Sequence, residues 1–444
     1  MRAADLKDKN IVIWGTGREG KAAAAFLRKT LPNAPFIFVD EAQGSDAIEG
    51  LGCECAVIRG DDISAALDAA DVLIKSPGVS LYHPLVQKLK ARGVPVTSLL
   101  NLWLADPRTA TVIGITGTKG KSTTAALLAH ALTALGKKAI AVGNIGVPVT
   151  ESSDENADFI VVEVSSYQAA NIDEKCPVGL LTSLYPEHLD WHKSLDVYYK
   201  DKLNLIAHCP TKIVNHEALE TLKQHNLSLN EALFFNQPSG IHTKNGCFYD
   251  NGQTIGLIKN AYLSRAHNLS NVCAVLAALK HLGLDMKAAL RGMEDFRGLP
   301  HRQQELGKKD SILYVDDSIA TTPQSAIAAM EAYPGRALTL IAGGQDRGID
   351  YTPLVDYVLQ KKIHAVICMG PSGERIFNTL KLSRSENISM CGSMKEAVTL
   401  AKTHTPQGGV ILLSPAAPSY GLFKDFVERG KCFAEAAGFE PAQK

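Results

Sequence analysis

Hydrophobic positions along the chain form short runs that alternate with longer segments of helical periodicity. In the N-terminal part, the runs NIVIWG, FIFVD and DVLIKS are separated by helix-like segments such as GKAAAAFLRKT. This alternation is typical of a parallel sheet with helices packed against it. It predicts a first α/β domain over residues 1–107.

The same alternation restarts twice farther along the chain. One series begins at TVIGITG and ends with the amphipathic segment SLDVYYKDKLNLIAH, and another begins at SILYVDDS. Between them, RGLPHRQQELG interrupts the helical pattern with glycine, proline and polar residues. We therefore predict a second α/β domain over residues 108–298 and a third over residues 299–444, with a linker near Gly298.

The composition narrows the possible partners. Lysine plus arginine and aspartate plus glutamate number 46 each, so no overall field attracts nucleic acid or an anionic membrane. The nine cysteines are scattered, and the pair Cys53 and Cys55 is too closely spaced for a zinc site. No apolar run approaches the ~20 residues that span a bilayer, and the N-terminus lacks a signal pattern. We expect a cytoplasmic protein with reduced thiols.

One turn in the second domain carries candidate chemistry. In TVIGITGTKGKSTTAALLAH a strand-like run ends in a turn with two glycines, and a helix follows at once. Backbone N–H groups and the positive end of the helix then point at one place, which suits a phosphate. Lys121 would contact the terminal phosphates of ATP or GTP, and Ser122 would ligate magnesium. The motif is shorter than the usual phosphate loop, since Ile115 stands where a glycine is expected; the alternative is a plain strand–turn–helix junction.

Two residues after neighbouring strands are candidate magnesium ligands. Glu163 ends the apolar run DFIVVEVSS, where an unpaired carboxylate would be costly. His188, in YPEHLDWH, follows another strand at its carboxyl end, where ligands of open α/β sheets gather. The spacing of His188 and His192 also resembles that of a zinc helix, but a third ligand is absent, so magnesium is favoured.

The first domain carries a second glycine-rich motif. GTGREG follows the run NIVIW, and Asp40 ends the next strand, which fits a dinucleotide-binding fingerprint. On these residues alone, a dehydrogenase with a nicotinamide cofactor is an alternative, although it leaves the phosphate loop unexplained.

Taken together, the motifs resemble those of the Mur ligases, and within them the ligases that add glutamate to UDP-N-acetylmuramoyl-L-alanine. The motifs follow the family order over nearly the whole chain: TGTKGKST, GNIG, VVEVSSYQ, PEHLDWH, RAHNLSN, GLPHR, YVDDSIATTP and LLSPAAPSYGLFKDFVERG. The resemblance implies a Rossmann-like UDP-binding domain, a central P-loop ATPase domain with a parallel sheet, and a C-terminal Rossmann-like domain that brings glutamate. It also implies a cytoplasmic bacterial enzyme, a monomer, that works through an acyl phosphate.

The resemblance also implies roles for individual residues. The expected catalytic residues are Lys121, Glu163, His188 and Lys202. The expected ATP-binding residues are Gly117, Thr118, Lys119, Gly120, Lys121, Ser122, Thr123, Asn268, Asn271, Arg302 and Asp317. The UDP-substrate is expected at Arg18, Glu19, Gly20, Asp40, Ser76, Asn144 and His188, and glutamate at Thr321, Arg347, Ser419 and Phe426. Two magnesium ions are expected at Ser122, Glu163, His188 and a carbamylated Lys202.

Three positions depart from the usual D-glutamate-adding pattern. Ile319 and Arg347 each stand where lysine is common, and Lys119 stands where asparagine is common. A forked guanidinium grips a carboxylate differently from an ammonium, and these departures resemble the smaller group that adds L-glutamate. We therefore favour L-glutamate over D-glutamate. The alternatives are a D-glutamate ligase, a folylpolyglutamate synthase-like ligase and a nucleotide-dependent switch without ligase activity.

Overall fold

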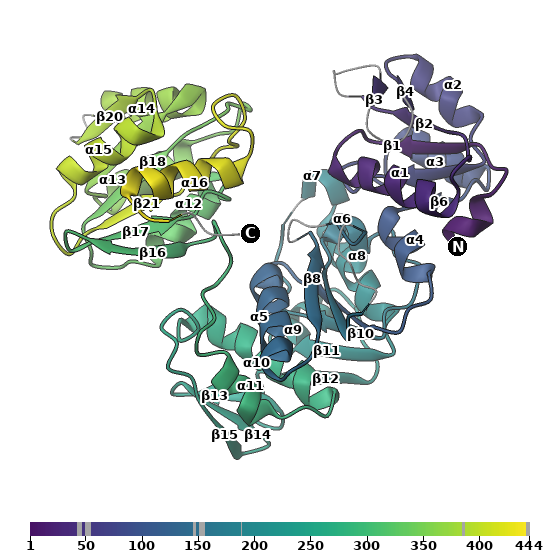
Figure 1. The fold of residues 1–444 in the computed structure, drawn as a ribbon, viewed down its shortest axis with the longest axis horizontal. Helices are drawn as coiled ribbons and strands as arrows, with labels where there is room; N and C mark the ends of the chain where they lie inside the picture. The colour runs from purple at the N-terminus through teal and green to yellow at the C-terminus, as the bar shows by residue number, and fades with distance from the viewer. Residues whose placement is uncertain are drawn as a thin grey trace. The chain divides into compact units, whose positions relative to one another are not determined.

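The computed structural model describes residues 1–41, 47–48, 55–144, 148–150, 156–187, 189–383 and 387–440. The chain divides into two compact units, Met1–Phe296 and Arg297–Lys444 (Figure 1). The first unit contains two large sheets and the second unit contains one.

The first sheet has the strand order β3-β4-β2-β1-β5-β6 and is parallel except for the short β3. Its strands are β1 (Ile11–Trp14), β2 (Phe36–Val39), β3 (Ala47–Ile48), β4 (Cys55–Ile58), β5 (Val72–Lys75) and β6 (Val96–Thr97). Its helices are η1 (Ala3–Leu6), α1 (Arg18–Thr30), α2 (Asp62–Asp68), α3 (Pro84–Ala91) and α4 (Leu99–Ala105). Strand β1 is buried along its whole length, as expected of a strand covered on both faces.

The second sheet is wholly parallel, with the order β12-β11-β10-β7-β9-β8. Its strands are β7 (Thr111–Thr116), β8 (Ala139–Gly143), β9 (Phe159–Glu163), β10 (Val178–Leu181), β11 (Thr211–Asn215) and β12 (Ala232–Phe235). The helices of this region are α5 (Lys121–Ala134), α6 (Ser166–Ala169), α7 (Leu189–His192), α8 (Leu195–Ala207), α9 (Ala218–Gln224), α10 (Ala266–His281) and α11 (Met286–Gly292). Helices α5 and α10 share one apolar cluster with the sheet.

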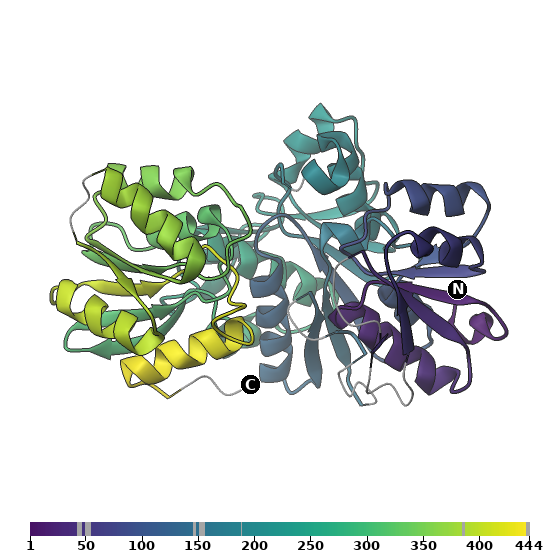
Figure 2. The ribbon, with the colours of Figure 1, turned by 90° about the horizontal axis from the view of Figure 1, so that it is seen from above.

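The third sheet has the order β16-β17-β21-β18-β19-β20, with β16 antiparallel at one edge. Its strands are β16 (Gln304–Lys309), β17 (Ile312–Asp316), β18 (Leu338–Ala342), β19 (Ala365–Met369), β20 (Ile388–Cys391) and β21 (Val410–Leu413). Its helices are α12 (Pro323–Glu331), α13 (Thr352–Gln360), α14 (Gly370–Leu382), α15 (Met394–His404) and α16 (Phe426–Ala437). They cover both faces of the sheet (Figure 2).

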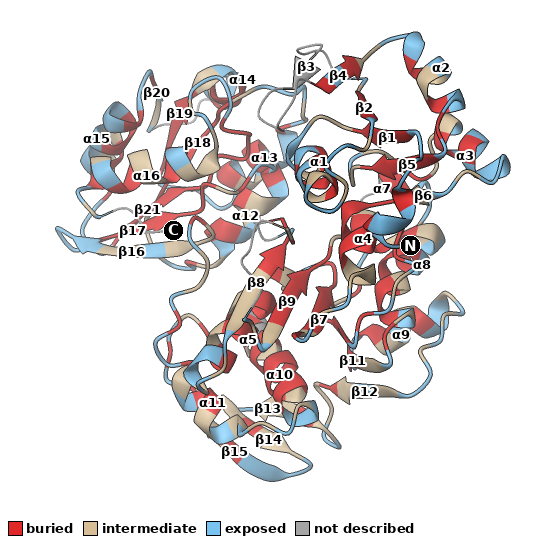
Figure 3. Cartoon of the chain, turned by 45° about the vertical axis from the view of Figure 1, so that its right-hand side comes forward, coloured by how far each residue is buried: buried red, intermediate tan, exposed pale blue. Residues whose placement is uncertain are grey.

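The predicted fold class is confirmed, and each apolar run that predicted a strand forms one in a parallel sheet. These strands are mostly buried, whereas the helices expose one face (Figure 3). Two features were not predicted. A small antiparallel sheet is formed by β13 (Ile241–Lys244), β14 (Cys247–Asp250) and β15 (Gln253–Leu257). The predicted linker also ends in β16, because its last residues pair with β17. None of the described helices has the length and apolarity to cross a bilayer.

Candidate functional site

The turn between β7 and α5 has the geometry of an anion-binding loop. Helix α5 begins at Lys121 after Gly120, and no side chain caps its first turn, so its N-terminal N–H groups remain for a ligand. Gly120 has φ +84°, and a Cβ there would lie 2.5 Å from Asn271 Oδ1. A Cβ at Gly117 would lie 2.0 Å from Thr182 Oγ1. Both glycines are therefore required by close contacts of the loop.

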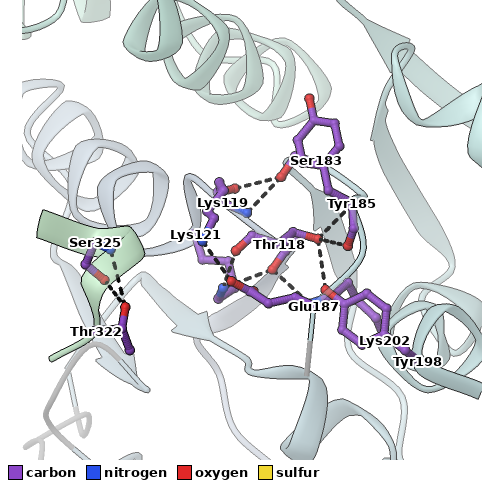
Figure 4. A network of polar contacts seen from close by, with 11 residues as sticks. Thr118, Lys119, Lys121, Ser183, Tyr185, Glu187, Tyr198, Lys202, Thr322 and Ser325 are labelled. Carbon is purple, nitrogen blue, oxygen red and sulfur yellow. Dashed lines mark hydrogen bonds and ion pairs between the residues drawn. The ribbon is translucent and has the colours of Figure 1, made fainter. Parts of the chain in front are cut away.

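Two lysine ammonium groups converge on one carbonyl of this loop (Figure 4). Lys121 Nζ donates to Gly117 O at 2.9 Å and to Thr118 O at 3.1 Å, and Lys202 Nζ donates to Gly117 O at 2.9 Å. Lys202 comes from α8 and is 1% exposed. Burial and, secondarily, the nearby Lys121 charge lower the pKa of Lys202 to about 7. A large fraction of Lys202 is therefore a neutral amine near neutral pH.

Side chains after β10 hold the loop in place. Thr118 Oγ1 lies 2.9 Å from the Tyr198 hydroxyl and accepts a hydrogen bond from Tyr185 N at 2.9 Å. The backbone N–H of Lys119 donates to Ser183 Oγ at 2.8 Å. The exposed Lys119 ammonium pairs with Glu187 at 2.7 Å (Figure 4). The loop backbone is thus fixed before any ligand arrives, which lowers the ordering cost of binding.

Glu163 brings a buried carboxylate to the same edge of the sheet. It ends β9 and pairs in register with Ile115 of β7, just before the phosphate loop. The residue is 1% exposed; Asn144 Nδ2 donates to its Oε1 at 3.2 Å, while Oε2 has no hydrogen-bond partner among the described residues. Such an oxygen suits a cation. Ser122, at the start of α5, is also buried. The predicted ligand His188 lies outside the described residues.

The predicted residues on the other side of the loop come from α10. Thr124 Oγ1 donates to Asn271 Oδ1 at 3.2 Å, and Asn271 Nδ2 donates to Asn268 Oδ1 at 3.0 Å. Asn268 in turn donates to Tyr262 O at 2.8 Å. The structure therefore brings Asn271 against Gly120 of the loop and holds Asn268 behind it.

In the first domain, the last two residues of the GTGREG motif line a cavity. Gly20 packs so closely that a Cβ would lie 1.9 Å from Gly15 O. The cavity is lined by Glu19, Gly20, Ser76 and Gln168, among others. Ser76 Oγ is a buried atom that lacks a hydrogen-bond partner among the described residues.

Two further predicted residues are Asp40, which binds the motif at Thr16, and Arg18 of the motif itself. Asp40 Oδ2 accepts from the Thr16 backbone at 2.7 Å and from the Thr16 hydroxyl at 2.6 Å. Arg18 is the first residue of α1, whose N-terminus also has no side-chain cap. Glu19, Gly20, Arg18 and Ser76 thus surround one helix N-terminus, which suits a diphosphate.

In the second unit, Asp317 lies just after β17. It is 4% exposed and accepts hydrogen bonds from Ser414 Oγ at 2.7 Å and Gln303 N at 3.1 Å. Burial raises its pKa to about 7. The positive charge of Arg302 partly opposes this rise in the pKa of Asp317. The Nε atom of Arg302 is buried and has no hydrogen-bond partner among the described residues.

The predicted glutamate residues lie after neighbouring strands of the third sheet. Arg347 follows β18, and Ser419 follows β21, which pairs with β18. Arg347 is exposed, with its guanidinium 6.0 Å from the ring centre of Tyr420. Thr321 is exposed, and Phe426 begins α16. Since carboxyl ends of parallel strands share one edge, these residues gather at that edge of the sheet.

Several residues of these sites were not predicted. Gln168 lines the first-domain cavity and donates to Glu19 at 3.3 Å. Its signal was the capping box in SSYQ, in which Ser165 and Gln168 bond reciprocally. Tyr198 and Glu187, which support the phosphate loop, had no sequence signal beyond their motif. His192, weighed as a zinc ligand, is buried and hydrogen-bonds to Asp201 and Ser166.

Family models match three consecutive parts of the chain. Residues 9–98 match the Mur ligase MurD-like N-terminal domain, residues 115–279 the Mur ligase middle domain, and residues 301–417 the Mur ligase glutamate ligase domain.

Curated relatives match over nearly the full length. A protein of Salinispora tropica named UDP-N-acetylmuramoyl-L-alanine–L-glutamate ligase is 40% identical, covering 98% of this chain and 99% of the relative. A protein of Xanthomonas campestris pv. campestris with the same name is 38% identical, covering 100% and 98%. Among solved structures, UDP-N-acetylmuramate-alanine ligase MurC from Thermotoga maritima matches with a TM-score of 0.58 at 20% identity, over 97% of this chain and 99% of that one. This last likeness supports the fold.

Proposed function

The chain belongs to the Mur ligase family, and from that premise we propose that it joins glutamate to UDP-N-acetylmuramoyl-L-alanine. It is an ATP-dependent ligase of peptidoglycan precursor synthesis. The observation that carries the proposal is the convergence of Lys121 and Lys202 on Gly117 O, at the same sheet edge as Glu163, whose Oε2 has no hydrogen-bond partner among the described residues. The cytoplasmic location and the monomeric state stay predictions.

The proposed reaction activates a poor electrophile. The terminal carboxylate of the muramoyl substrate accepts the γ-phosphoryl group of ATP, which gives an acyl phosphate and ADP. The neutral amine of glutamate then attacks the acyl carbon, and the tetrahedral intermediate collapses to an amide and phosphate. Two anions must approach each other in the first step, so cationic groups aimed at the transferred phosphoryl group stabilise the transition state. Lys121 is the residue proposed for this role.

The residues present fit the divalent cation that the family uses. Glu163 offers a carboxylate oxygen that has no partner in the described part of the chain, and Ser122 offers a hydroxyl at the start of α5. Two bound magnesium ions would offset the negative charge of the phosphates. We propose that the neutral Lys202 amine adds carbon dioxide and releases a proton to solvent, which gives a carbamate anion that would help to hold the metal. The lowered pKa of Lys202 supports the proposal, because only the neutral amine reacts.

We further propose L-glutamate as the preferred isomer. Arg347 and Ile319 each stand where D-glutamate ligases commonly have lysine, so the positive charge near the predicted glutamate-binding residues is distributed differently. A different charge distribution changes which polar groups of the bound amino acid find a partner. The names of the full-length relatives support this choice.

A phosphate-release assay with components omitted one at a time tests the proposal. We expect release only when UDP-N-acetylmuramoyl-L-alanine, ATP and glutamate are all present. Release without the muramoyl substrate, or release supported by a folate in its place, would contradict it.

A further inference from the structure

A chain of contacts connects a loop of the first domain with α7 of the second. The loop follows β5 and contains Ser76, already noted at the first-domain cavity. Trp191 Nε1 donates to Gly78 O of this loop at 3.3 Å, and Ser80 Oγ donates to Trp191 O at 3.3 Å. Trp191 is buried and stacks on Tyr167, with ring centres 4.7 Å apart. The indole of Trp191 therefore binds the loop at Gly78, and its backbone carbonyl binds the loop at Ser80.

The next residue, His192, continues the chain to α8. Its side chain is fully buried, with Nδ1 2.7 Å from Asp201 Oδ2 and Nε2 3.0 Å from Ser166 Oγ. The Tyr82 hydroxyl, from the first domain, donates to the same carboxylate, 2.8 and 2.9 Å from its two oxygens. Asp201 is thus held from both domains at once.

A buried lysine of the first domain also interacts electrostatically with this carboxylate. Lys75 is 2% exposed, and its ammonium lies 5.7 Å from the Trp191 ring centre and donates to Ser76 O at 3.3 Å. Burial lowers the pKa of Lys75 to about 7, and Asp201 opposes that shift. The Asp201 carboxylate therefore favours the charged form of Lys75, which adds an electrostatic interaction to the hydrogen bonds between the two domains.

Asp201 immediately precedes Lys202 on α8. Because the helix backbone is rigid, holding the Asp201 side chain constrains the rotation of the helix and thereby the direction of the Lys202 Cα–Cβ bond. Lys202 reaches Gly117 O from that position. Hydrogen bonds, together with the chain links Trp191–His192 and Asp201–Lys202, thus connect Gly78 of the first domain with Gly117 of the phosphate loop.

We propose that Asp201 is a positioning residue that couples the loop of residues 76–80 to Lys202, so that a substrate held by the first domain orients the Lys202 side chain. The proposal rests on the proposed function. The hydrogen bonds that link Ser166, His192 and Asp201 resemble those of a hydrolytic Ser-His-Asp triad. Ser166 is only 3% exposed, however, so a substrate has no room to reach its hydroxyl. We therefore assign these three side chains a role in orienting Lys202 and no role as reacting groups.

The experiment compares Asp201→Asn, which keeps the size of the side chain but removes its charge, with Tyr82→Phe, which removes only the hydroxyl that binds Asp201 from the first domain. Asp196→Asn is the matched control, because Asp196 lies on the same helix, pairs with His225 at 2.5 Å and is 78% exposed at its side chain. We would measure kcat and KM for each substrate, with folding checked by circular dichroism. In parallel, ¹³C NMR with ¹³C-bicarbonate would follow the Lys202 carbamate before and after addition of UDP-N-acetylmuramoyl-L-alanine.

We expect Asp201→Asn to lower kcat about 10- to 100-fold, as for groups that orient a metal-site residue, with KM for ATP within about twofold. Tyr82→Phe should lower kcat less, and in both variants the carbamate signal should no longer respond to the muramoyl substrate. Wild-type kcat and carbamate response in either folded variant, or labelling of Ser166 by a fluorophosphonate, would overturn the proposal. If Asp201→Asn does not fold, Tyr82→Phe decides alone.

The experiments distinguish a failure of the proposed function from a failure of the proposed role of Asp201. Absence of a ligation product from the wild-type protein would overturn the proposed function. A carbamate signal that responds to the muramoyl substrate in the wild type and the control, but not in Tyr82→Phe, would still support the coupling.

Discussion

At the residue scale, two lysines that contact the same carbonyl differ in their surroundings. Lys121 begins a helix at the edge of the phosphate loop, whereas Lys202 is enclosed. The first lies where it can contact a phosphate, and burial lowers the pKa of the second to about 7, which suits it to lose its proton. The sequence motif predicted Lys121. It did not distinguish Lys202 from a solvated helix lysine, because burial depends on α6, β7 and β10 packing around α8, and only the family resemblance singled it out.

Replacing Lys121 with alanine should remove ligation without unfolding the protein. The side chain contacts loop carbonyls and not the apolar core, so we expect kcat to fall about 100-fold or more with little change in Tm. Lys138→Ala, an exposed lysine beyond the same helix, serves as the control. Near-normal turnover of Lys121→Ala would show that this turn is not the phosphate site.

Replacing Lys202 with alanine should inactivate the enzyme, and short-chain carboxylic acids should restore part of the activity by supplying the missing anion. Lys200→Ala, exposed on the same helix, should stay active. In the wild type, the carbamate signal should grow as the pH rises through about 7, because the amine is protonated and unreactive below its lowered pKa. A signal that is independent of pH in this range would contradict the carbamate.

Asp317 gives a stability prediction with a definite sign. Its folded pKa of about 7 lies above the ordinary 3.8, so the folded state holds the proton longer and stability falls as the pH rises between these values. Asp317→Asn removes this penalty while keeping an acceptor for Gln303 N. The Tm of the variant relative to wild type should therefore increase from about pH 5 to about pH 8. Asp310→Asn, exposed beyond the other end of β17, should show no such trend.

At the scale of elements, the parallel strands were predictable because each is an apolar run bounded by turn residues and covered on both faces. The small sheet of β13–β15 was not, because its strands are short and mix polar with apolar positions, as in IHTK. The cluster around Asp201 was also not predictable from the sequence, because its members come from five separate parts of the chain: β5, α6, α7, α8 and the segment before α3.

Helix α5 offers an internal comparison of two left-handed glycines. Gly120 precedes the helix and would clash with Asn271 if it carried a Cβ, whereas Gly136 follows the helix, has φ +75° and would meet nothing within 4 Å. Alanine at either position should cost about 1–3 kcal/mol of folding stability through backbone strain. Only Gly120→Ala should also weaken nucleotide binding, which isothermal titration would measure as a higher Kd for ADP. Equal effects on nucleotide binding would contradict the role of the loop.

At the scale of the whole molecule, the order of three α/β domains was predictable from the succession of motifs, and matched family models support it. The preferred isomer of glutamate could not be predicted in the same way. It depends on the positions from which the side chains of Arg347, Ser419 and Thr321 would contact the ligand. These side chains come from separate loops at one sheet edge, and their spacing is a property of the folded unit.

The measurement that tests the account most directly is mass spectrometry of the product formed from ATP and UDP-N-acetylmuramoyl-L-alanine with each pure isomer of glutamate. The account predicts that the UDP-muramoyl dipeptide forms with L-glutamate, depends on ATP and disappears in Lys121→Ala. Clear preference for D-glutamate would contradict the assigned isomer, and no dipeptide with either isomer would contradict the proposed function.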